Sequence, residues 1–393
     1  MSKIETVLPK VDVKTAQGGA GLLVDRLRDR FLSFRDRLLT RRDVRQRAAG
    51  FFLTRPLVRR RARALFDLTA GFVYFQILHA CVQLDVFETL ADGPLSIAEL
   101  SGKLGLDVAG TRRLMDAAVA LDLAERRSGN RYGLGELGLA MVNEPGLAAM
   151  VRHHALVYRD LQDPVGLLAG GGDRTGLQSY WAYATSEAPE ALKREDVEDY
   201  SELMAASQSF IAEEVLDSYS LDRHRTLLDV GGGAGAFAIA AARRAPHLQV
   251  GVFDLPAVAD IARKRFSEGG LTKRARAVGG SFMTDDLPRD TDLITLVRVL
   301  YDHPDATVET LLRSVYDALQ PGGTLLIAEP MSGIRGAGPV GDAYFGFYLL
   351  AMGSGRPRRV DEHLAFLKSA GFQSPKLVQT RVPLQTSLIV AHR

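Results

Sequence analysis

The sequence predicts an α/β protein in which a helical, winged-helix domain precedes a doubly wound, Rossmann-like sheet. Residues 226–256 are typical of a strand, a glycine turn, an Ala-rich helix and a second strand. Residues 124–134 predict a small hairpin that turns at Ser128-Gly129-Asn130. Near the C-terminus, KLVQTRV and LQTSLIVAH predict two closely joined strands, and we expect them to form a reversed hairpin at the end of the sheet.

The composition indicates an ordinary globular protein. Its 393 residues are 46% hydrophobic, which is enough for a sizeable core and for two or three domains. The single cysteine, Cys81, excludes an intramolecular disulfide framework and a Cys-rich zinc site. The N-terminus lacks the apolar run of a secretory signal, and no cluster of His and carboxylates has metal-ligand spacing. We therefore expect a metal-independent, cytoplasmic protein.

Charge is distributed unevenly along the chain. Residues 1–63 contain 17 basic and 6 acidic side chains, whereas the remainder contains 32 basic and 41 acidic ones, for a net charge of +2. We assign 1–64 as a basic N-terminal arm with a flexible lead over 1–20. In 21–64, Leu and Phe recur at helical spacing between arginines, which predicts amphipathic helices. Two interpretations remain open: packing on the protein body, or attachment to an anionic membrane surface or a partner on it.

No stretch reaches the roughly 18 charge-free apolar residues that span a bilayer. The nearest candidates, 69–84 and 343–353, are predicted to be buried helices.

Residues 65–150 have the outline of a winged helix. Ser96 and Asp107 are placed to cap two helices ahead of the hairpin. Alone, this outline would indicate a DNA-binding repressor with Thr111, Arg112 and Arg113 on its recognition helix. The competing interpretation is a dimerisation module of the same shape.

Residues 151–220 are assigned as linking helices and the roof of a pocket. They contain a Gly-rich loop at 169–176 and a last helix at 197–219. His153 and His154 lie on a helix expected at this roof, and the alternative is the polar edge of an ordinary helix.

Residues 221–393 carry a ligand-binding glycine loop. Gly231, Gly233 and Gly235 allow a tight turn and a close approach to a ligand, and Asp254 follows where an acid can bind a ribose diol. The loop also satisfies GxGxxA, so an NAD-dependent dehydrogenase stays open. Against it, only about 160 residues follow the loop, and Asp229 lies where it can receive the amino group of an amino-acid ligand or serve as a buried structural acid.

Six ordered motifs carry a family resemblance: DVGGGAG, FDLP, GGSF, RVLYDHPDA, ALQPGGTLLIAEP and LKSAGF. In order and spacing they resemble the S-adenosylmethionine-dependent O-methyltransferases of the plant caffeate and bacterial polyketide type. The similarity covers about residues 70–393 and includes the winged helix, which in this family dimerises and roofs the substrate pocket. The basic arm and YDHPDA look most like the carotenoid hydroxyl O-methyltransferases of photosynthetic bacteria.

The resemblance implies S-adenosylmethionine as cofactor and S-adenosylhomocysteine as product. The glycine loop would line the methionine portion, Asp254 would hold the ribose, and Leu255 would lie beside the adenine. Ser281 replaces an Asp that usually contacts the adenine amino group, so that contact is weaker or comes from Thr284 or Asp285. The remaining implied binding residues are Phe282, which packs on the ring, and Arg298, at the pocket wall.

The reaction centre departs from the family pattern. Where the family has His-Asp-Trp with His as general base, this chain has Tyr301-Asp302-His303. We expect Tyr301 to contact the acceptor oxygen, and His303 is the alternative proton acceptor. Glu329 matches a family acid, which here would orient Tyr301 or accept the proton itself.

The helix at 341–355 presents aromatic and aliphatic side chains that suit a long hydrophobic ligand. Core packing is the alternative. The sequence therefore predicts a homodimeric enzyme that methylates the tertiary hydroxyl of a hydroxylated carotenoid, with peripheral attachment to the inner membrane through the arm. Methylation of another hydrophobic ring or a bacteriochlorophyllide is the second possibility. A winged-helix DNA-binding regulator is a remote third, so no nucleic-acid partner is expected.

Overall fold

The computed structural model describes residues 19–170, 174–181, 204, 208, 211–289, 291–381 and 386–393, with side chains from residue 24. The chain divides into two compact units, Met1–Gln76 and Ile77–Arg393, each considered by itself. Most of the predicted flexible lead lies outside the described residues.

The first unit consists of helices. It contains α1 (Gly19–Thr40), α2 (Arg42–Gly50) and the first part of α3 (Arg55–Gln83). The amphipathic helices predicted for 21–64 are confirmed. On α1 five exposed apolar side chains follow one another at intervals of three or four residues, so they share one face of the helix: Val24, Leu27, Phe31, Phe34 and Leu38.

Helix α3 differs from its prediction as a buried helix. Phe72 is 62% exposed and Val73 is 43% exposed, whereas Cys81 and Val82 near the C-terminal end are buried. The prediction for 69–84 is wrong over the first part of that segment, where Thr69, Phe72 and Val73 are exposed in the single chain. By length and composition alone, α3 could cross a membrane. Among the described residues one helix passes this test, and a single such helix is weak evidence for a membrane span.

The winged helix is confirmed. Helices α4 (Val86–Ala91), α5 (Ile97–Leu104), α6 (Val108–Ala120) and α7 (Glu136–Leu139) surround strands β1 (Leu95–Ser96), β2 (Ala124–Arg127) and β3 (Arg131–Leu134). The sheet is antiparallel in the order β1-β3-β2. Ser96 accepts a hydrogen bond from Glu99 N–H, and Asp107 accepts one from Gly110 N–H, so both predicted caps are present. Thr111 is fully buried, which removes it from any DNA-reading surface.

Between the winged helix and the sheet, the described residues include α8 (Pro145–Asp160), α9 (Pro164–Leu168) and α10 (Gly176–Tyr180). Part of the predicted Gly-rich loop, residues 171–173, lies outside the described residues. Most of the first half of the helix predicted for 197–219 also lies outside the described residues. Residues 211–218 are helical.

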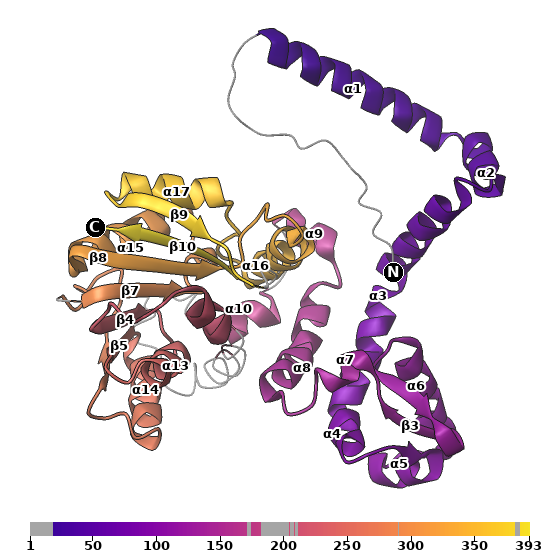
Figure 1. Cartoon of the computed structure of the whole chain (residues 1–393), viewed down its shortest axis with the longest axis horizontal. Coiled ribbons are helices and arrows are strands. Elements are labelled where there is room, and N and C mark those ends of the chain that lie inside the picture. Colours follow the sequence, from indigo (N-terminus) through magenta and orange to yellow (C-terminus); the bar gives the residue numbers. More distant parts are fainter. Residues whose placement is uncertain are drawn as a thin grey trace. The chain divides into compact units, whose positions relative to one another are not determined.

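The C-terminal domain is built on a seven-stranded sheet of order β6-β5-β4-β7-β8-β10-β9 (Figure 1). Five strands are parallel: β4 (Thr226–Val230), β5 (Gln249–Asp254), β6 (Ala275–Gly279), β7 (Thr291–Val297) and β8 (Leu319–Glu329). The last strand, β10 (Ser387–His392), runs antiparallel between β8 and β9 (Gln373–Val378). The doubly wound sheet with a reversed terminal strand is therefore confirmed, while residues 382–385 of the hairpin turn are not described.

Alternation along the strands divides the core between the two faces of the sheet. Leu227 packs with α13 (Ala236–Arg244) and α14 (Pro256–Glu268), whereas the next residue, Leu228, packs with α15 (Asp305–Ala318) and α17 (Val360–Ser369). With both faces covered, the carboxyl edge of the parallel strands is the place where loops can form a site.

Candidate functional site

A cavity of about 320 Å³ lies at the carboxyl edge of the sheet. The loops after β4, β5, β6 and β7 surround it, together with the start of α15. Eight of the twelve residues predicted for cofactor binding or catalysis line it: Gly231, Gly233, Asp254, Leu255, Ser281, Phe282, Arg298 and His303. The geometry thus brings together residues from four separate segments of the chain.

The backbone conformation of the loop after β4 requires glycine. Gly231 has φ +68°, and a Cβ there would lie 2.8 Å from Val299 Cγ2. Gly233 has φ +58°, and a Cβ there would meet no atom within 4 Å, so this position faces open space. Gly235, also at positive φ, immediately precedes α13. The loop therefore leaves room for a ligand against its backbone.

Asp254 connects the tip of β5 to that loop. Its carboxylate accepts a hydrogen bond from Gly233 N–H at 2.7 Å and another from Leu255 N–H at 2.7 Å. Burial raises the pKa of Asp254 to about 6, although the two N–H donors act in the opposite direction. Each carboxylate oxygen keeps a second acceptor site, so the half-buried group fits the ribose diol expected from the resemblance.

Asp229 lies beneath the glycine loop and does not line the cavity. It is 1% exposed, and it accepts a hydrogen bond from Thr295 Oγ1 at 2.7 Å. Burial raises the pKa of Asp229 to about 7. A Cβ at Gly232 would lie 2.6 Å from its Oδ2. The geometry favours the alternative of a buried structural acid that supports the loop.

On the opposite side of the cavity, this chain has Ser281 where the family pattern has an acidic residue. Ser281 and Phe282 line it, and Ser281 Oγ accepts a hydrogen bond from Met283 N–H at 3.3 Å. Asp285 accepts the Ser281 N–H at 2.8 Å. Thr284 and Asp285 are exposed and do not line the cavity, so neither replaces the missing acid in this geometry.

Arg298 and Tyr301 form a pair at the end of β7. Arg298 lines the cavity with φ +59°, a left-handed conformation that is strained in a non-glycine residue and is often found at functional sites. Its Nη2 donates a hydrogen bond to the Tyr301 hydroxyl oxygen at 3.3 Å. Tyr301 is 2% exposed and does not line the cavity, and burial holds the pKa of its phenol well above the ordinary value.

His303 faces the cavity on the same side as Phe282. The two rings meet edge to face with centroids 5.3 Å apart. Burial, with a smaller contribution from the Arg358 guanidinium, lowers the pKa of His303 to about 4, so the imidazole is neutral at pH 7.

Glu329, at the end of β8, is fully buried and does not line the cavity. Its Oε1 accepts hydrogen bonds from Val299 N–H at 3.0 Å and Leu300 N–H at 2.7 Å. Among the described residues Oε2 has no hydrogen-bond partner, and burial raises the pKa of this carboxyl to about 7. Glu329 thus contacts the backbone of the loop that carries Tyr301.

Arg358 was not identified from the sequence, yet it holds the same loop from another side. The side chain is fully buried. It donates to Leu300 O at 2.7 Å, to His303 O at 2.6 Å and to Asp305 Oδ1 at 2.7 Å. The motif GSGRPRRV contains three arginines, and no local pattern indicates which one is buried.

The segment around Arg358 lies against the loop along its length. Arg356 N–H donates to Tyr301 O at 2.9 Å, and Ser354 Oγ donates to Asp302 O at 2.8 Å. A Cβ at Gly355, which has φ +75°, would lie 2.1 Å from Tyr301 O. This close approach explains the glycine.

An aromatic cluster adjoins Tyr301. It combines α8 and α10 with the π-helix Pro339–Phe345 and α16 (Gly346–Met352). His153 Nε2 lies 2.8 Å from the Tyr348 hydroxyl, and His154 Nε2 lies 2.9 Å from the Tyr344 hydroxyl. The predicted roof histidines therefore do contact the helix at 341–355. Phe345, Tyr348, Leu349, Ala351 and Met352 are buried, in agreement with the buried-helix prediction for 343–353, while Phe347 is 38% exposed.

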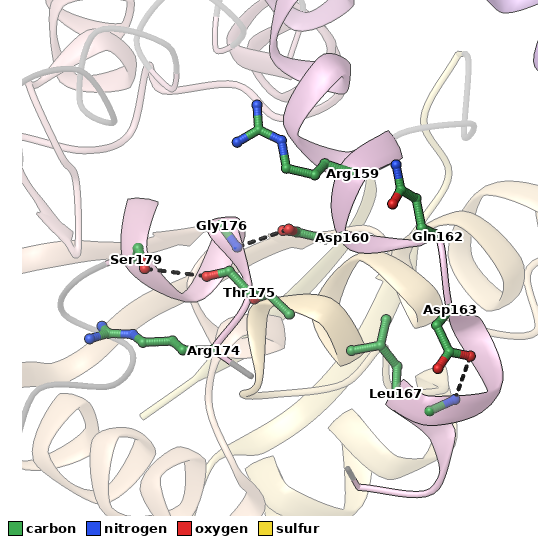
Figure 2. Close-up of a pocket in the computed structure, with 10 residues that line it drawn as sticks. Arg159, Asp160, Gln162, Asp163, Leu167, Arg174, Thr175, Gly176 and Ser179 are labelled. Carbon is green, nitrogen blue, oxygen red and sulfur yellow. Dashed lines mark hydrogen bonds between the residues drawn. The ribbon is translucent and has the colours of Figure 1, made fainter. Parts of the chain in front are cut away.

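A second depression, of about 480 Å³, lies between α8, α9 and α10 (Figure 2). Its carboxylates serve as helix caps: Asp160 accepts from Gly176 N–H and Leu177 N–H, and Asp163 accepts from Gly166 N–H. These contacts account for the carboxylates as structural groups. Within the described ranges, no group of three His, Cys, Asp or Glu residues is arranged to hold a metal ion.

Comparisons with known proteins agree with this geometry. Residues 158–373 match the family model of the O-methyltransferase domain, and residues 66–144 match that of the O-methyltransferase dimerisation domain. The demethylspheroidene O-methyltransferase of Cereibacter sphaeroides is 41% identical over 341 residues, which cover 86% of this chain and 89% of the relative. The enzyme of that name from Rhodobacter capsulatus is 42% identical over 361 residues, covering 90% and 89%.

A solved structure is similar over almost its full length. The crystal structure of human N-acetylserotonin methyltransferase in complex with SAM has a TM-score of 0.70 and 26% sequence identity, covering 84% of this chain and 97% of that one.

The buried Glu329 carboxyl gives a pH-dependent prediction. Between its ordinary pKa of 4.5 and the raised value of about 7, the folded chain holds a proton that the unfolded chain releases, so this group's contribution to stability falls as pH rises. Glu329→Gln should therefore raise the free energy of unfolding at pH 8, by at most about 3 kcal/mol, and change it little at pH 5. Urea unfolding at both pH values measures this. Glu268→Gln, at a side chain 62% exposed, is the control. An equal loss of stability at both pH values would contradict a raised pKa.

Arg358→Lys should destabilise the fold by about 3–5 kcal/mol, because one ammonium cannot reach the three acceptors that the guanidinium serves. Arg359→Lys is the matched control, since that side chain is 63% exposed, and it should change stability by less than about 0.5 kcal/mol. Chemical unfolding of both variants measures the difference. Equal losses of stability in the two variants would show that the contacts of Arg358 do not stabilise the loop.

Proposed function

Because the chain belongs to the O-methyltransferase family, we propose that it transfers a methyl group to the tertiary hydroxyl of a hydroxylated carotenoid. The observation that carries this proposal is 41–42% identity to two demethylspheroidene O-methyltransferases along nearly the whole chain. The chain is an S-adenosylmethionine-dependent methyltransferase. The aromatic cluster beside Tyr301 supports an apolar acceptor.

S-adenosylmethionine supplies an electrophilic methyl group on its sulfonium. The glycine loop would lie along it, Asp254 would bind the ribose, and Leu255 and Phe282 would flank the adenine. Room at Gly233 and the remaining acceptor sites of Asp254 support this assignment.

Positioning and exclusion of water supply much of the rate enhancement of such a transfer. Tyr301, whose oxygen accepts from Arg298, keeps its own O–H to orient the acceptor oxygen. A phenol with a raised pKa is a poor base, so its role is orientation. Glu329 holds the loop that carries it. His303 packs against Phe282 and forms the wall on the cofactor side.

The match to the dimerisation domain indicates a homodimer. The matched residues include Phe66, Leu68, Phe72 and Val73, all exposed in the single chain. A second copy of the chain would cover these exposed side chains.

Helix α1 lies outside both family matches, so the dimerisation domain does not account for its exposed apolar face. Residues 1–63 carry 17 basic against 6 acidic side chains. An apolar face on a cationic helix binds in the interface of anionic membranes. Peripheral attachment through α1 would bring the enzyme to a carotenoid acceptor dissolved in a bilayer.

The function is tested with methyl-labelled S-adenosylmethionine and hydroxylated carotenoid in detergent micelles. We expect label in an ether at the tertiary oxygen and none with the same carotenoid lacking the hydroxyl. Asp254→Asn should raise the Kd for S-adenosylmethionine about tenfold or more, since the charge-assisted acceptor is lost. Label in a bacteriochlorophyllide but not in the carotenoid would replace the proposed acceptor.

Membrane attachment is tested by sedimentation with phosphatidylglycerol vesicles and with phosphatidylcholine vesicles. The protein should bind the anionic vesicles, and Phe31→Glu should weaken binding severalfold by placing a charge on the apolar face. Ser33→Glu adds the same charge on the polar side of α1 and should weaken it much less. Equal effects, or unchanged binding after deletion of residues 1–63, would exclude α1 as the attachment site.

A further inference from the structure

Methylation of an alcohol requires a destination for the hydroxyl proton. A tertiary alcohol is too weak an acid to ionise beforehand, but its oxygen becomes strongly acidic as the new bond to carbon forms. Even a weakly basic neutral imidazole can accept a proton at that stage. The question is which acceptor in the aromatic cluster is connected to the cavity.

His154 has a defined tautomer. Its Nδ1 lies 2.5 Å from Met150 O, and because a carbonyl oxygen only accepts, Nδ1 carries the proton. Burial lowers the pKa of His154, so the ring is neutral near pH 7 and Nε2 holds a lone pair. The Tyr344 hydroxyl, 2.9 Å away, therefore donates to Nε2. The lone pairs of the Tyr344 oxygen can then accept a hydrogen bond from the hydroxyl that is to be methylated.

The neighbouring pair, His153 and Tyr348, is arranged differently. Tyr348 is 5% exposed, and its oxygen receives a hydrogen bond from Trp181 Nε1 at 3.3 Å. Tyr344 is only half-buried. The pair that can reach an acceptor molecule is therefore Tyr344 with His154.

Tyr344 lies one ring away from the proposed orienting residue. The Phe345 ring meets Tyr344 at 5.0 Å and Tyr301 at 5.7 Å, both edge to face. The charge of Arg298, which lines the cavity and binds Tyr301, also acts on Tyr344 and opposes the rise in its pKa caused by burial. The two phenols thus pack against the same Phe345 ring, and Arg298 connects them to the cavity.

We propose that Tyr344 and His154 relay the acceptor's proton out of the site, an inference that rests on the proposed O-methyl transfer. As the oxygen–methyl bond forms and the sulfur–methyl bond breaks, the acceptor's O–H proton passes to the Tyr344 oxygen. The Tyr344 proton passes at the same time to His154 Nε2, which leaves a neutral phenol and an imidazolium. The imidazolium then loses its Nε2 proton to water, and the pair is restored without any further reactant.

Tyr344→Phe keeps the ring and removes the relay. We expect kcat to fall about 10²-fold, with the Kd for S-adenosylhomocysteine within twofold of the wild-type value. His154→Gln should lower kcat to a similar degree, because the amide cannot take up a proton. Tyr348→Phe is the comparison, since it breaks the adjacent phenol–imidazole pair, and its kcat should fall less than tenfold. A Tyr344→Phe enzyme with kcat within twofold of wild type, or a greater loss in Tyr348→Phe, would overturn the relay.

The tautomer is tested separately by NMR of the full chain labelled with ¹⁵N-histidine, with His154→Gln used to assign the signal. We expect a neutral His154 protonated at Nδ1 at pH 7.5, and protonation at Nε2 would overturn the relay. This readout needs no acceptor, so it decides the pair's arrangement even if hydroxylated carotenoid is not methylated. In that case the kcat comparison is made with whichever alcohol or phenol accepts the label.

Discussion

The buried guanidinium of Arg358 is the constraint on which the geometry of the site depends. Removing a cation from water is costly unless every donor finds an acceptor. Arg358 meets this condition by binding the carbonyls of Leu300 and His303 and the carboxylate of Asp305. Two of these acceptors belong to the loop between β7 and α15, and the third is the first residue of α15, so the loop cannot move without leaving a buried charge unsatisfied.

Glu329 acts on the same loop with the opposite polarity. Its carboxyl accepts the N–H groups of Val299 and Leu300, while Arg358 donates to the carbonyls of Leu300 and His303. The side chains of Tyr301 and His303 are therefore aimed by groups that bind the backbone next to them, and neither depends on a direct contact with Glu329. At the start of the loop, Arg298 has a positive φ, and its backbone N–H donates to Ala328 O at 2.8 Å.

The sequence was sufficient wherever structure is decided by neighbouring residues. The caps at Ser96 and Asp107, the turn at 128–130 and the glycine loop with Asp254 follow from local spacing, and the structure has them. The contacts of Arg358 and of the His154–Tyr344 pair join segments 50–190 residues apart, which no local pattern records. The exposed part of α3 was mispredicted for a related reason, because apolar composition predicts burial without showing whether the chain itself supplies a covering surface.

The replacement of the family's histidine by Tyr301 is consistent with the hydrogen bonds around that position. Arg298 donates to the Tyr301 oxygen, and a phenol so held presents its O–H to a ligand as a donor. If the Tyr301 O–H donates to the oxygen that will be methylated, the group that takes the proton from that oxygen must lie on its other side. In the proposed relay that proton acceptor is His154 on the roof helix α8, a half-buried imidazole whose pKa is lowered by burial. The proposal thereby divides orientation and proton removal between the sheet and the roof, so both depend on the packing of these two elements.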